Sequence, residues 1–203
     1  MKMGKFEKLF INRPSHAERV IKHGERLLRL VDVKEKQNYL EVGCGIGAMS
    51  KHVAEKYLLN VTGIDVDPEQ IQLAQESTAG VPNIRFLEAD ATDLPFQDED
   101  FDIVLSFGVM HHIANWLDAL KEIGRVLKPR GYFIYYDLVY PDRASRIWSA
   151  GTARSIARNY GFPTVRALNS FVSQNNLSTL HSSLSKRYML VFNLYEAVYQ
   201  RQD

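Results

Sequence analysis

The sequence predicts an α/β fold in which a mostly parallel sheet is covered by helices on both faces. Runs of strand-forming residues alternate with helical segments through the middle of the chain, which is the pattern of repeated β-α-β units. A glycine-rich turn follows the first of these strands and leads into a helix. The chain has 203 residues, 45% of them hydrophobic and 24% charged, so its composition is that of an ordinary globular protein.

The first predicted element is a helix over residues 15–31. Ser15, just after Pro14, is placed to be its N-cap. The simplest interpretation is a packing helix with a solvated outer face, and the alternative is a lid whose basic face meets an anion. The apolar stripe consists of Val20, Leu27, Leu28 and Val31, and the basic face of Arg19, Lys22, Arg26 and Arg29.

The alternating part of the chain follows. Three helices are predicted. The second begins at Pro68 and ends before Gly80, and the third is stopped by Lys128-Pro129-Arg130-Gly131. The predicted strands cover 39–42, 61–64, 84–87, 101–107 and 132–136, and the other two helices cover 48–58 and 116–127.

The remaining residues differ from this pattern. An Arg-rich insertion over 141–163 is followed by a short helix over 164–175. Two strand-like stretches, 177–187 and 189–199, are expected to pair as an antiparallel hairpin. We interpret residues 1–203 as a single domain. Its parts are an N-terminal helical lid (1–36), a core (37–140), the insertion (141–163), and the helix with the hairpin (164–203).

The near-neutral net charge of +1 hides a partition along the chain. The net charge is +5 over residues 1–36, −9 over 37–140 and +5 over 141–203, which argues against a uniformly basic nucleic-acid binder. A single cysteine, Cys44, excludes an internal disulfide framework and a Cys-rich zinc site, and no metal site is predicted. The charged N-terminus and the lack of a long apolar run predict a cytoplasmic protein without a membrane span.

The glycine-rich turn is the first candidate for ligand binding. Gly43, Gly45 and Gly47 let the backbone approach a ligand closely, and the helix that begins there presents backbone N–H groups. Asp65 lies 22 residues after Gly43, at the end of the second strand, where a carboxylate can accept both hydroxyls of a ribose. NAD and S-adenosylmethionine share that ribose, so these residues alone leave both open.

Further motifs separate the two cofactors. Glu41 stands two residues before the first glycine, and apolar Val66 follows Asp65. Together with the segments 88–96, 101–104, 111–112 and 127–132, this series resembles the class I S-adenosylmethionine-dependent methyltransferases. The likeness is greatest to the type 11 small-molecule branch, which includes quinone-biosynthesis enzymes, and covers about residues 37–138.

The resemblance implies a Rossmann-like sheet of seven strands in the order 3-2-1-4-5-7-6, with S-adenosylmethionine bound at the carboxyl ends of the strands. It implies that the glycines approach the methionine part of the cofactor, with Glu41 anchoring the loop or the amino group. Other roles follow by position: Asp65 for the ribose, Val66 for the adenine face, Asp90 and Ala91 for the adenine edge, and Ser106 and Phe107 near the ammonium group. Asp67, by contrast, is interpreted as a solvated loop charge.

Methyl transfer depends mainly on alignment, and a general base helps only where the acceptor must lose a proton. His111 and His112, just after the fourth strand, and Asp137 at the end of the fifth are the candidates, although His112 could equally pack or cap a helix. The fourth-strand segment 106–109 lacks the Asn/Asp-Pro-Pro-Tyr/Phe motif of amino-methylating nucleic-acid enzymes, so a small-molecule acceptor is favoured.

The two flanks suggest an acceptor with an apolar or aromatic body and an anionic group, with solvated helix faces as the alternative. The residues concerned are Arg13, His16, Arg19, Lys22, Arg143, Arg146, Arg154 and Arg158, with the aromatics Phe6, Phe10, Trp148 and Tyr160. A nicotinamide-dependent oxidoreductase and a non-catalytic S-adenosylmethionine-binding protein remain as rival functions. The acceptor atom, the pathway and the oligomeric state are left open.

Overall fold

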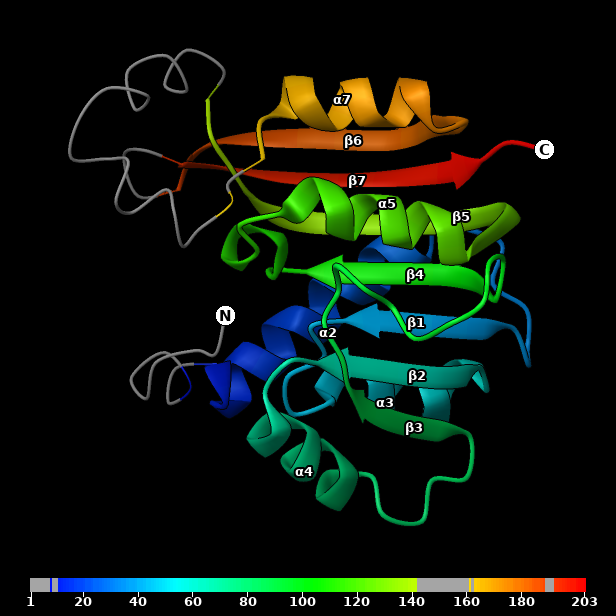
Figure 1. Ribbon diagram of the computed structural model, residues 1–203. Helices are drawn as coiled ribbons and strands as arrows, with labels where there is room; N and C mark the ends of the chain where they lie inside the picture. The colour runs from blue at the N-terminus through cyan, green and yellow to red at the C-terminus, as the bar shows by residue number, and fades with distance from the viewer. Residues whose placement is uncertain (1–7, 9–10, 142–160, 162, 189–191) are drawn as a thin grey trace.

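The computed structural model describes residues 8, 11–141, 161, 163–188 and 192–203. Within them, seven strands form one sheet in the order β3-β2-β1-β4-β5-β7-β6, as the family resemblance implies (Figure 1). The strands are β1 Asn38–Val42, β2 Asn60–Asp65, β3 Ile84–Glu88, β4 Phe101–Phe107, β5 Leu127–Val139, β6 Leu177–Tyr188 and β7 Phe192–Arg201.

The first five strands run parallel, and β7 is antiparallel to both of its neighbours. At the centre of the sheet, Val42 pairs with Ile64 of β2 and Ser106 of β4. The carboxyl ends of these three strands therefore meet at one edge of the sheet, where open α/β sheets bind their ligands.

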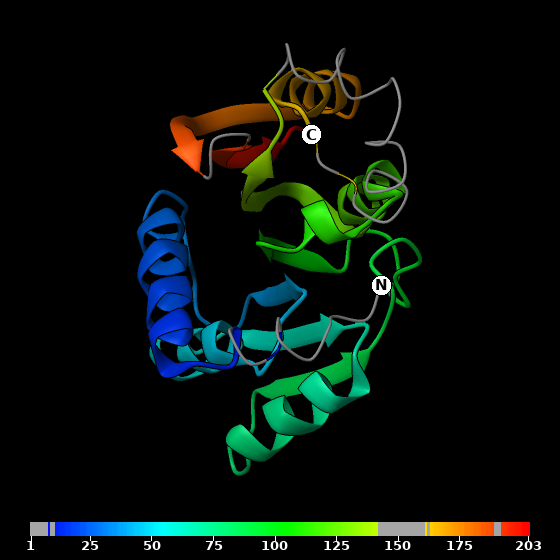
Figure 2. The ribbon, with the colours of Figure 1, turned by 90° about the vertical axis from the view of Figure 1, so that its left-hand side faces the viewer.

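Helices cover both faces of the sheet. Figure 2 shows α2 and α3 on one face and α5 and α7 on the other, while α4 packs against β2 and β3. Their bounds are α2 Pro14–Leu28, α3 Ala48–Tyr57, α4 Pro68–Ser77, α5 Trp116–Val126 and α7 Val165–Gln174, and a 3-10 turn, η1, spans Met110–His112. Arg26 of α2 forms a two-point ion pair with Glu196 of β7, and one of its contacts, between Nη1 and Oε1, is 3.0 Å.

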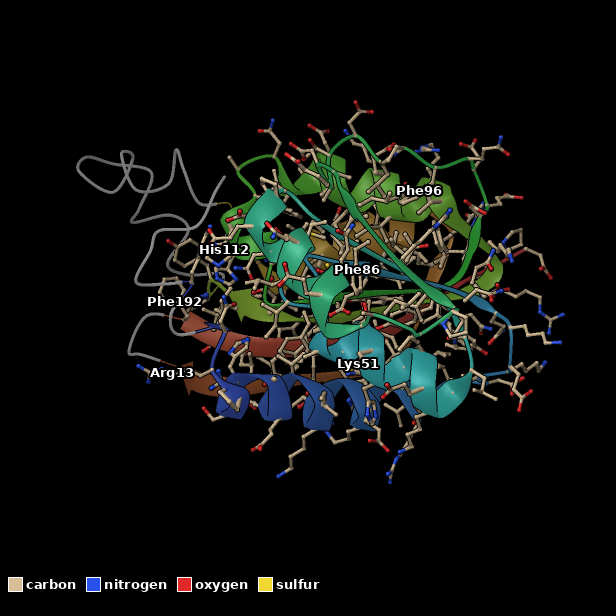
Figure 3. All side chains as sticks on the ribbon, turned by 90° about the horizontal axis from the view of Figure 1, so that it is seen from below. Arg13, Lys51, Phe86, Phe96, His112 and Phe192 are labelled. Atoms are coloured by element: carbon tan, nitrogen blue, oxygen red, sulfur yellow. The ribbon has the colours of Figure 1, made fainter. Side chains whose placement is uncertain are left out.

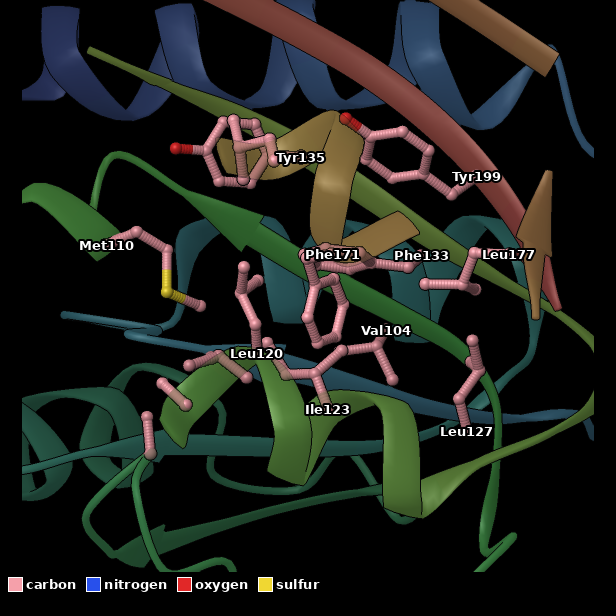
Figure 4. Close-up of a cluster of buried hydrophobic side chains, with 14 of the residues drawn as sticks. Val104, Met110, Leu120, Ile123, Leu127, Phe133, Tyr135, Phe171, Leu177 and Tyr199 are labelled. Atoms are coloured by element: carbon pink, nitrogen blue, oxygen red, sulfur yellow. The ribbon is translucent and has the colours of Figure 1, made fainter. Parts of the chain in front are cut away.

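The alternation of side chains along β4 divides the core in two. Val104 packs on the side of α5 and α7, in the cluster shown in Figure 4, while Ile103 and Leu105 pack on the side of α2 and α3. Ile123 and Phe133 on one side and Met49 and Ile134 on the other are also almost fully buried. Each such side chain contributes roughly 2 kcal/mol through the apolar surface it removes from water.

Two local predictions are wrong. Ser15 is not the N-cap of α2, because Pro14 occupies the first turn and the cap is Arg13, which makes no side-chain hydrogen bond to the helix. The fifth strand begins earlier than expected: α5 does end before segment 128–131, but β5 starts at Leu127 and not at Tyr132. Leu127 already pairs with Phe101, and a register shift before Ile103 accommodates the extra residues. The insertion expected over 141–163 lies almost entirely outside the described residues.

Candidate active site

A cleft opens at the carboxyl ends of β1, β2 and β4. Its larger compartment has a volume of about 350 Å³ and is lined by the ends of β1 and β2 and by the segments 89–92 and 112–115. A smaller compartment of about 140 Å³ is lined by the beginning of α2, the glycine-rich turn and the segment after β4. Gly43, Asp65, Val109 and His112 line both compartments, so we treat the two as one cleft.

The glycine-rich turn adopts a backbone that other residues rarely take. Gly43, Gly45 and Gly47 have φ angles of 72°, 52° and 75°. A Cβ on Gly43 would lie 2.5 Å from Cγ2 of Val109, so a side chain there would collide with the wall of the cleft. Gly47 is the N-cap of α3 and supplies no side-chain acceptor to the N–H groups of the first turn. The turn is thus a narrow cradle with a helix N-terminus beside it.

Asp65 joins this turn to the end of β2. Its Oδ2 accepts the N–H of Gly45 at 3.0 Å, and its Oδ1 accepts the N–H of Asp67 at the same distance. Only 8% of the residue is exposed, and that burial raises the pKa of the carboxyl group above its ordinary value. Because it lines both compartments, this carboxylate is positioned to accept hydrogen bonds from a ligand that spans the cleft.

Glu41 lies beneath the turn and lines the smaller compartment. The residue is 3% exposed, and the hydroxyl of Ser50 on α3 donates a hydrogen bond to Oε2. Burial raises the pKa of Glu41 to about 8, and the nearby charge of Asp65 adds to that effect. A cationic group brought into this compartment would favour the ionised carboxylate.

The residues expected at the adenine end lie together in the larger compartment. Val66, Asp90 and Ala91 all line it. Asp90 is exposed, and its Oδ1 accepts hydrogen bonds from the N–H and the hydroxyl of Thr92 at 2.9 and 2.8 Å. Asp90 therefore shapes its own turn, and it is also positioned to meet a ligand.

Ser106 and Phe107 occupy different surroundings. Ser106 is fully buried, its hydroxyl has no hydrogen-bond partner among the described residues, and it is not among the residues that line the cleft. Phe107 lines the smaller compartment and stacks on Tyr136 of β5, with ring centroids 4.2 Å apart and planes 10° apart. An aromatic wall thus stands beside the methionine end of the predicted cofactor site.

The two candidate bases differ in their contacts. His112 lines both compartments. His111 contacts Asp137 of β5, with 2.5 Å between ring Nδ1 and Oδ1, and the side chain of Asp137 is fully buried. The ring centroids of His111 and His112 lie 3.9 Å apart. The structure thus joins two of the three candidate bases in a hydrogen-bonded pair.

Asp67 was missed as a structural residue, and its assignment to the solvated loop charges is wrong. It is 2% exposed, it is the N-cap of α4 through the N–H of Glu69 at 3.1 Å, and its Oδ2 lies 2.6 Å from Nζ of Lys8. The Pro68 that follows it could have identified Asp67 as a cap. No local signal predicts the contact with Lys8, 59 residues away.

The basic flanks are only partly described. Arg13, Arg19 and Lys22 are exposed, and Nη2 of Arg19 lies 2.8 Å from Nδ1 of His16, which lines the smaller compartment. Figure 3 shows Arg13 and His112 at the same edge of the molecule. The other flanking residues named above, Arg143, Arg146, Arg154, Arg158, Phe6, Phe10, Trp148 and Tyr160, lie outside the described residues.

Comparisons with known proteins identify the core of the chain. Residues 40–135 match the sequence profile of a family described as "Methyltransferase domain". Residues 40–135 thus resemble a methyltransferase domain. The class I architecture of the chain follows from the strand order together with that match. S-adenosylmethionine is the cofactor of this class. The glycine cradle, the buried Asp65 and the buried Glu41 all fit it.

Two curated relatives of the chain are methyltransferases named for small molecules. The chain is 35% identical over 122 residues to a demethylmenaquinone methyltransferase of Staphylococcus aureus, which covers 58% of this chain and 49% of the relative. It is 33% identical over 135 residues to ajmaline N-methyltransferase of Rauvolfia serpentina, covering 59% and 46%. The chain thus spans about half the length of the curated relatives it matches.

The fold also occurs in a protein with a different reaction in its name. The solved structure of the [4+2]-cyclase SpnF superposes with a TM-score of 0.78 at 17% identity, covering 91% of this chain and 82% of that one. Such a likeness shows the fold and not the reaction. Within the part of the chain that the structure describes, no helix has both the length and the hydropathy needed to cross a bilayer.

Proposed function

We propose that this protein transfers a methyl group from S-adenosylmethionine to a small-molecule acceptor. The observation that carries the proposal is the pair of buried carboxyl groups, Glu41 and Asp65, beside a positive-φ glycine turn in one cleft. A nicotinamide-binding cleft gives Glu41 no role, whereas a ligand with an amino-acid part and a ribose uses both acids. The names of the relatives support the same chemistry.

In this proposal the residues that the family resemblance points to have binding roles. Asp65 accepts hydrogen bonds from the ribose diol, Glu41 faces the amino group, and the backbone of the glycine turn lies along the methionine part. Val66 packs against the adenine face. The remaining cofactor residues are Asp90 and Ala91 at the adenine edge and Phe107 toward the ammonium group, with the buried Ser106 beside Phe107 at the end of β4.

The bound cofactor supplies a methyl group already activated by the sulfonium. The chain must therefore hold the acceptor in line with that group, and positioning alone can supply several kcal/mol of the barrier. Phe107 and the basic side chains at the start of α2 support an acceptor with an aromatic body and an anionic group. His111 and His112 are the proposed bases.

Binding of S-adenosylhomocysteine, measured by calorimetry, tests the cofactor assignment. Asp65→Ala should weaken binding by about 10- to 100-fold, because hydrogen bonds to a charged group contribute roughly 1.5–3 kcal/mol. Asp65→Asn keeps an acceptor for the N–H of Gly45 and so checks that the loss does not come from a disordered turn. Asp93→Ala, at an exposed carboxylate of the neighbouring loop, is the matched control. NADH that raises the melting temperature where S-adenosylhomocysteine does not would overturn the assignment.

A protein that binds S-adenosylmethionine without transferring its methyl group is the second candidate, because a named cyclase shares the fold. Incubation with S-adenosylmethionine and a panel of phenols, amines, thiols and carboxylic acids, followed by measurement of S-adenosylhomocysteine formation, separates the enzyme from the non-catalytic binding protein. Binding without turnover of any panel member favours the non-catalytic function.

The cytoplasmic location and the single-domain division of residues 1–203 remain predictions. Limited proteolysis followed by mass spectrometry tests the domain division.

A further inference from the structure

We propose that His111 and Asp137 form a proton-accepting pair, and that the acceptor accordingly presents a weakly acidic hydroxyl group, such as that of a phenol. The inference rests on the proposed function and narrows its substrate class. Asp137 is a positioning residue, since it acts through His111.

The contacts of the pair fix both partners. Oδ1 of Asp137 lies 2.5 Å from Nδ1 of His111 and accepts the N–H of Leu138 at 2.6 Å, while Oδ2 accepts the N–H of His111 at 3.3 Å. A carboxylate that receives backbone N–H groups on both oxygens is held as an acceptor. Nδ1 of His111 therefore carries the hydrogen that points to Asp137, and Nε2 is the nitrogen that takes up a proton.

Burial makes this contact energetically significant. The side chain of Asp137 is fully buried, and that of His111 is 15% exposed. A fixed negative charge next to the ring stabilises the imidazolium that forms when Nε2 accepts a proton, and it does so more strongly than an exposed carboxylate screened by water. The pair is thus built to accept a proton and also to orient the ring.

The location of the pair relates it to the cleft. His111 belongs to η1, which follows β4 within a few residues. Asp137 comes directly after Tyr136, whose ring stacks on Phe107. His112, whose ring is 3.9 Å from that of His111, lines both compartments. The pair therefore lies next to the smaller compartment, where the methionine part of the cofactor is proposed to bind.

The chemistry of proton acceptance selects the acceptor. A neutral hydroxyl oxygen is a weak nucleophile until its proton leaves, whereas a free amine already has a lone pair available. In the proposed step the acceptor's O–H bond breaks and its proton passes to Nε2 of His111, while an oxygen electron pair forms the bond to the methyl carbon. The electron pair of the breaking carbon–sulfur bond stays with sulfur, which becomes a neutral thioether. A stacked aromatic wall at Phe107 suits the ring of a phenol.

The first test measures the hydrogen bond between His111 and Asp137 directly and does not require turnover. In ¹⁵N NMR spectra of the protein, His111 should show a protonated Nδ1 with a downfield, slowly exchanging proton. Asp137→Asn should move that signal upfield and speed its exchange, because an amide oxygen accepts a weaker hydrogen bond than a carboxylate oxygen. The ring of His52, which contacts Glu25 on another face of the molecule, serves as the internal control and should keep its spectrum. An unchanged His111 spectrum in Asp137→Asn overturns the proposed pair.

The second test reads the chemistry, with phenol and 4-nitrophenol as acceptors. Asp137→Asn and His111→Gln should lower kcat for phenol by about 100-fold, within the range that general-base catalysis contributes. The KM for S-adenosylmethionine and the melting temperature should stay close to those of the wild type. The loss should shrink for 4-nitrophenol, which is already largely ionised at pH 8. A purely structural pair would instead lower both rates equally, together with stability.

The outcomes separate this inference from the proposed function. Failure to bind S-adenosylhomocysteine would overturn the proposed function, and the substrate class with it. Normal binding with turnover of amines or thiols only, or with no methyl ether from any hydroxyl compound of the panel, would overturn the hydroxyl acceptor alone. Equal rates for wild type and Asp137→Asn on phenol would overturn the role of Asp137.

Discussion

Replacement of Glu41 by glutamine should change how the stability of this protein depends on pH. Burial holds the pKa of Glu41 at about 8, compared with an ordinary value of 4.5. Between those two values the folded protein keeps the proton and the unfolded chain loses it. The free energy of unfolding of the wild type therefore falls as the pH rises from 4.5 to 8. In Glu41→Gln this site carries no charge at any pH, so the part of the fall that Glu41 causes should disappear.

The size of the effect follows from the same numbers. Each pH unit over which only the folded state holds the proton costs about 1.4 kcal/mol, so the wild type should lose roughly 3 kcal/mol by pH 7 and roughly 5 by pH 8. For a chain of this size, 1 kcal/mol corresponds to about 2–4 °C in melting temperature. Glu41→Gln should thus melt roughly 6–12 °C above the wild type at pH 7. At pH 4.5 the two should be equal.

Thermal unfolding followed by circular dichroism at pH 4.5, 6, 7 and 8 measures this difference. Glu55→Gln, at an exposed glutamate of the neighbouring helix α3, is the matched control and should follow the wild type at every pH. A difference between Glu41→Gln and wild type of less than about 2 °C at every pH would refute the reasoning, because burial of Glu41 would then carry no ionisation cost.

The same carboxyl group predicts a proton coupled to ligand binding. An ammonium group in the smaller compartment should ionise Glu41, so S-adenosylhomocysteine should release a proton below pH 8. Calorimetry in buffers of different ionisation enthalpy measures the number of protons released. Methylthioadenosine, which lacks the amino-acid part, should release none, and neither should S-adenosylhomocysteine with Glu41→Gln. Equal proton release by both ligands would contradict a role of Glu41 toward the amino group.

Three further predictions concern the surroundings of the cleft. Gly43→Ala should abolish detectable binding of S-adenosylhomocysteine because its Cβ would collide with Val109, whereas Gly80→Ala, at a φ of 89° with nothing within 4 Å, should lower stability by about 1–2 kcal/mol and leave binding intact. Intact binding in Gly43→Ala would show that the turn can move. Asp67→Ala should lower the melting temperature by a few degrees through loss of an N-cap worth about 1 kcal/mol, and Asp67→Asn should recover most of it. The thiol of Cys44, whose pKa is raised by burial, should react with a disulfide reagent at least 100-fold more slowly in the native protein than in urea, and equal rates would contradict its burial.

The parts of the site that could be predicted from sequence are those with local signals. The glycine turn lies directly after the first predicted strand, and Asp65 and Val66 lie at the end of the second. Their place at strand ends indicates, from the sequence alone, that they lie near one another at one edge of the sheet. The strand order could be anticipated only through the family resemblance, because periodicity identifies strands without saying which ones are neighbours.

The parts that could not be predicted depend on contacts between distant segments. His111 and Asp137 were separate candidates until the pairing of β4 with β5 placed them together. Asp67 is an acidic residue in a loop and would be expected to be solvated. Only the packing of α4 and the approach of Lys8 bury it. Residue type indicates that a group can ionise, whereas its burial and partners come from the tertiary structure.

The ion pair between Arg26 and Glu196 has a consequence for biosynthesis. It fastens α2, which leaves the ribosome before all seven strands of the sheet, to β7, which is made after the other six. The beginning of α2 also forms one wall of the smaller compartment, through Ala17 and Val20. A nascent chain that already contains the glycine turn and Asp65 therefore lacks the contact that secures this wall. Chains that end before residue 192 should accordingly bind S-adenosylhomocysteine more weakly than the full chain, although every proposed cofactor residue is present in them.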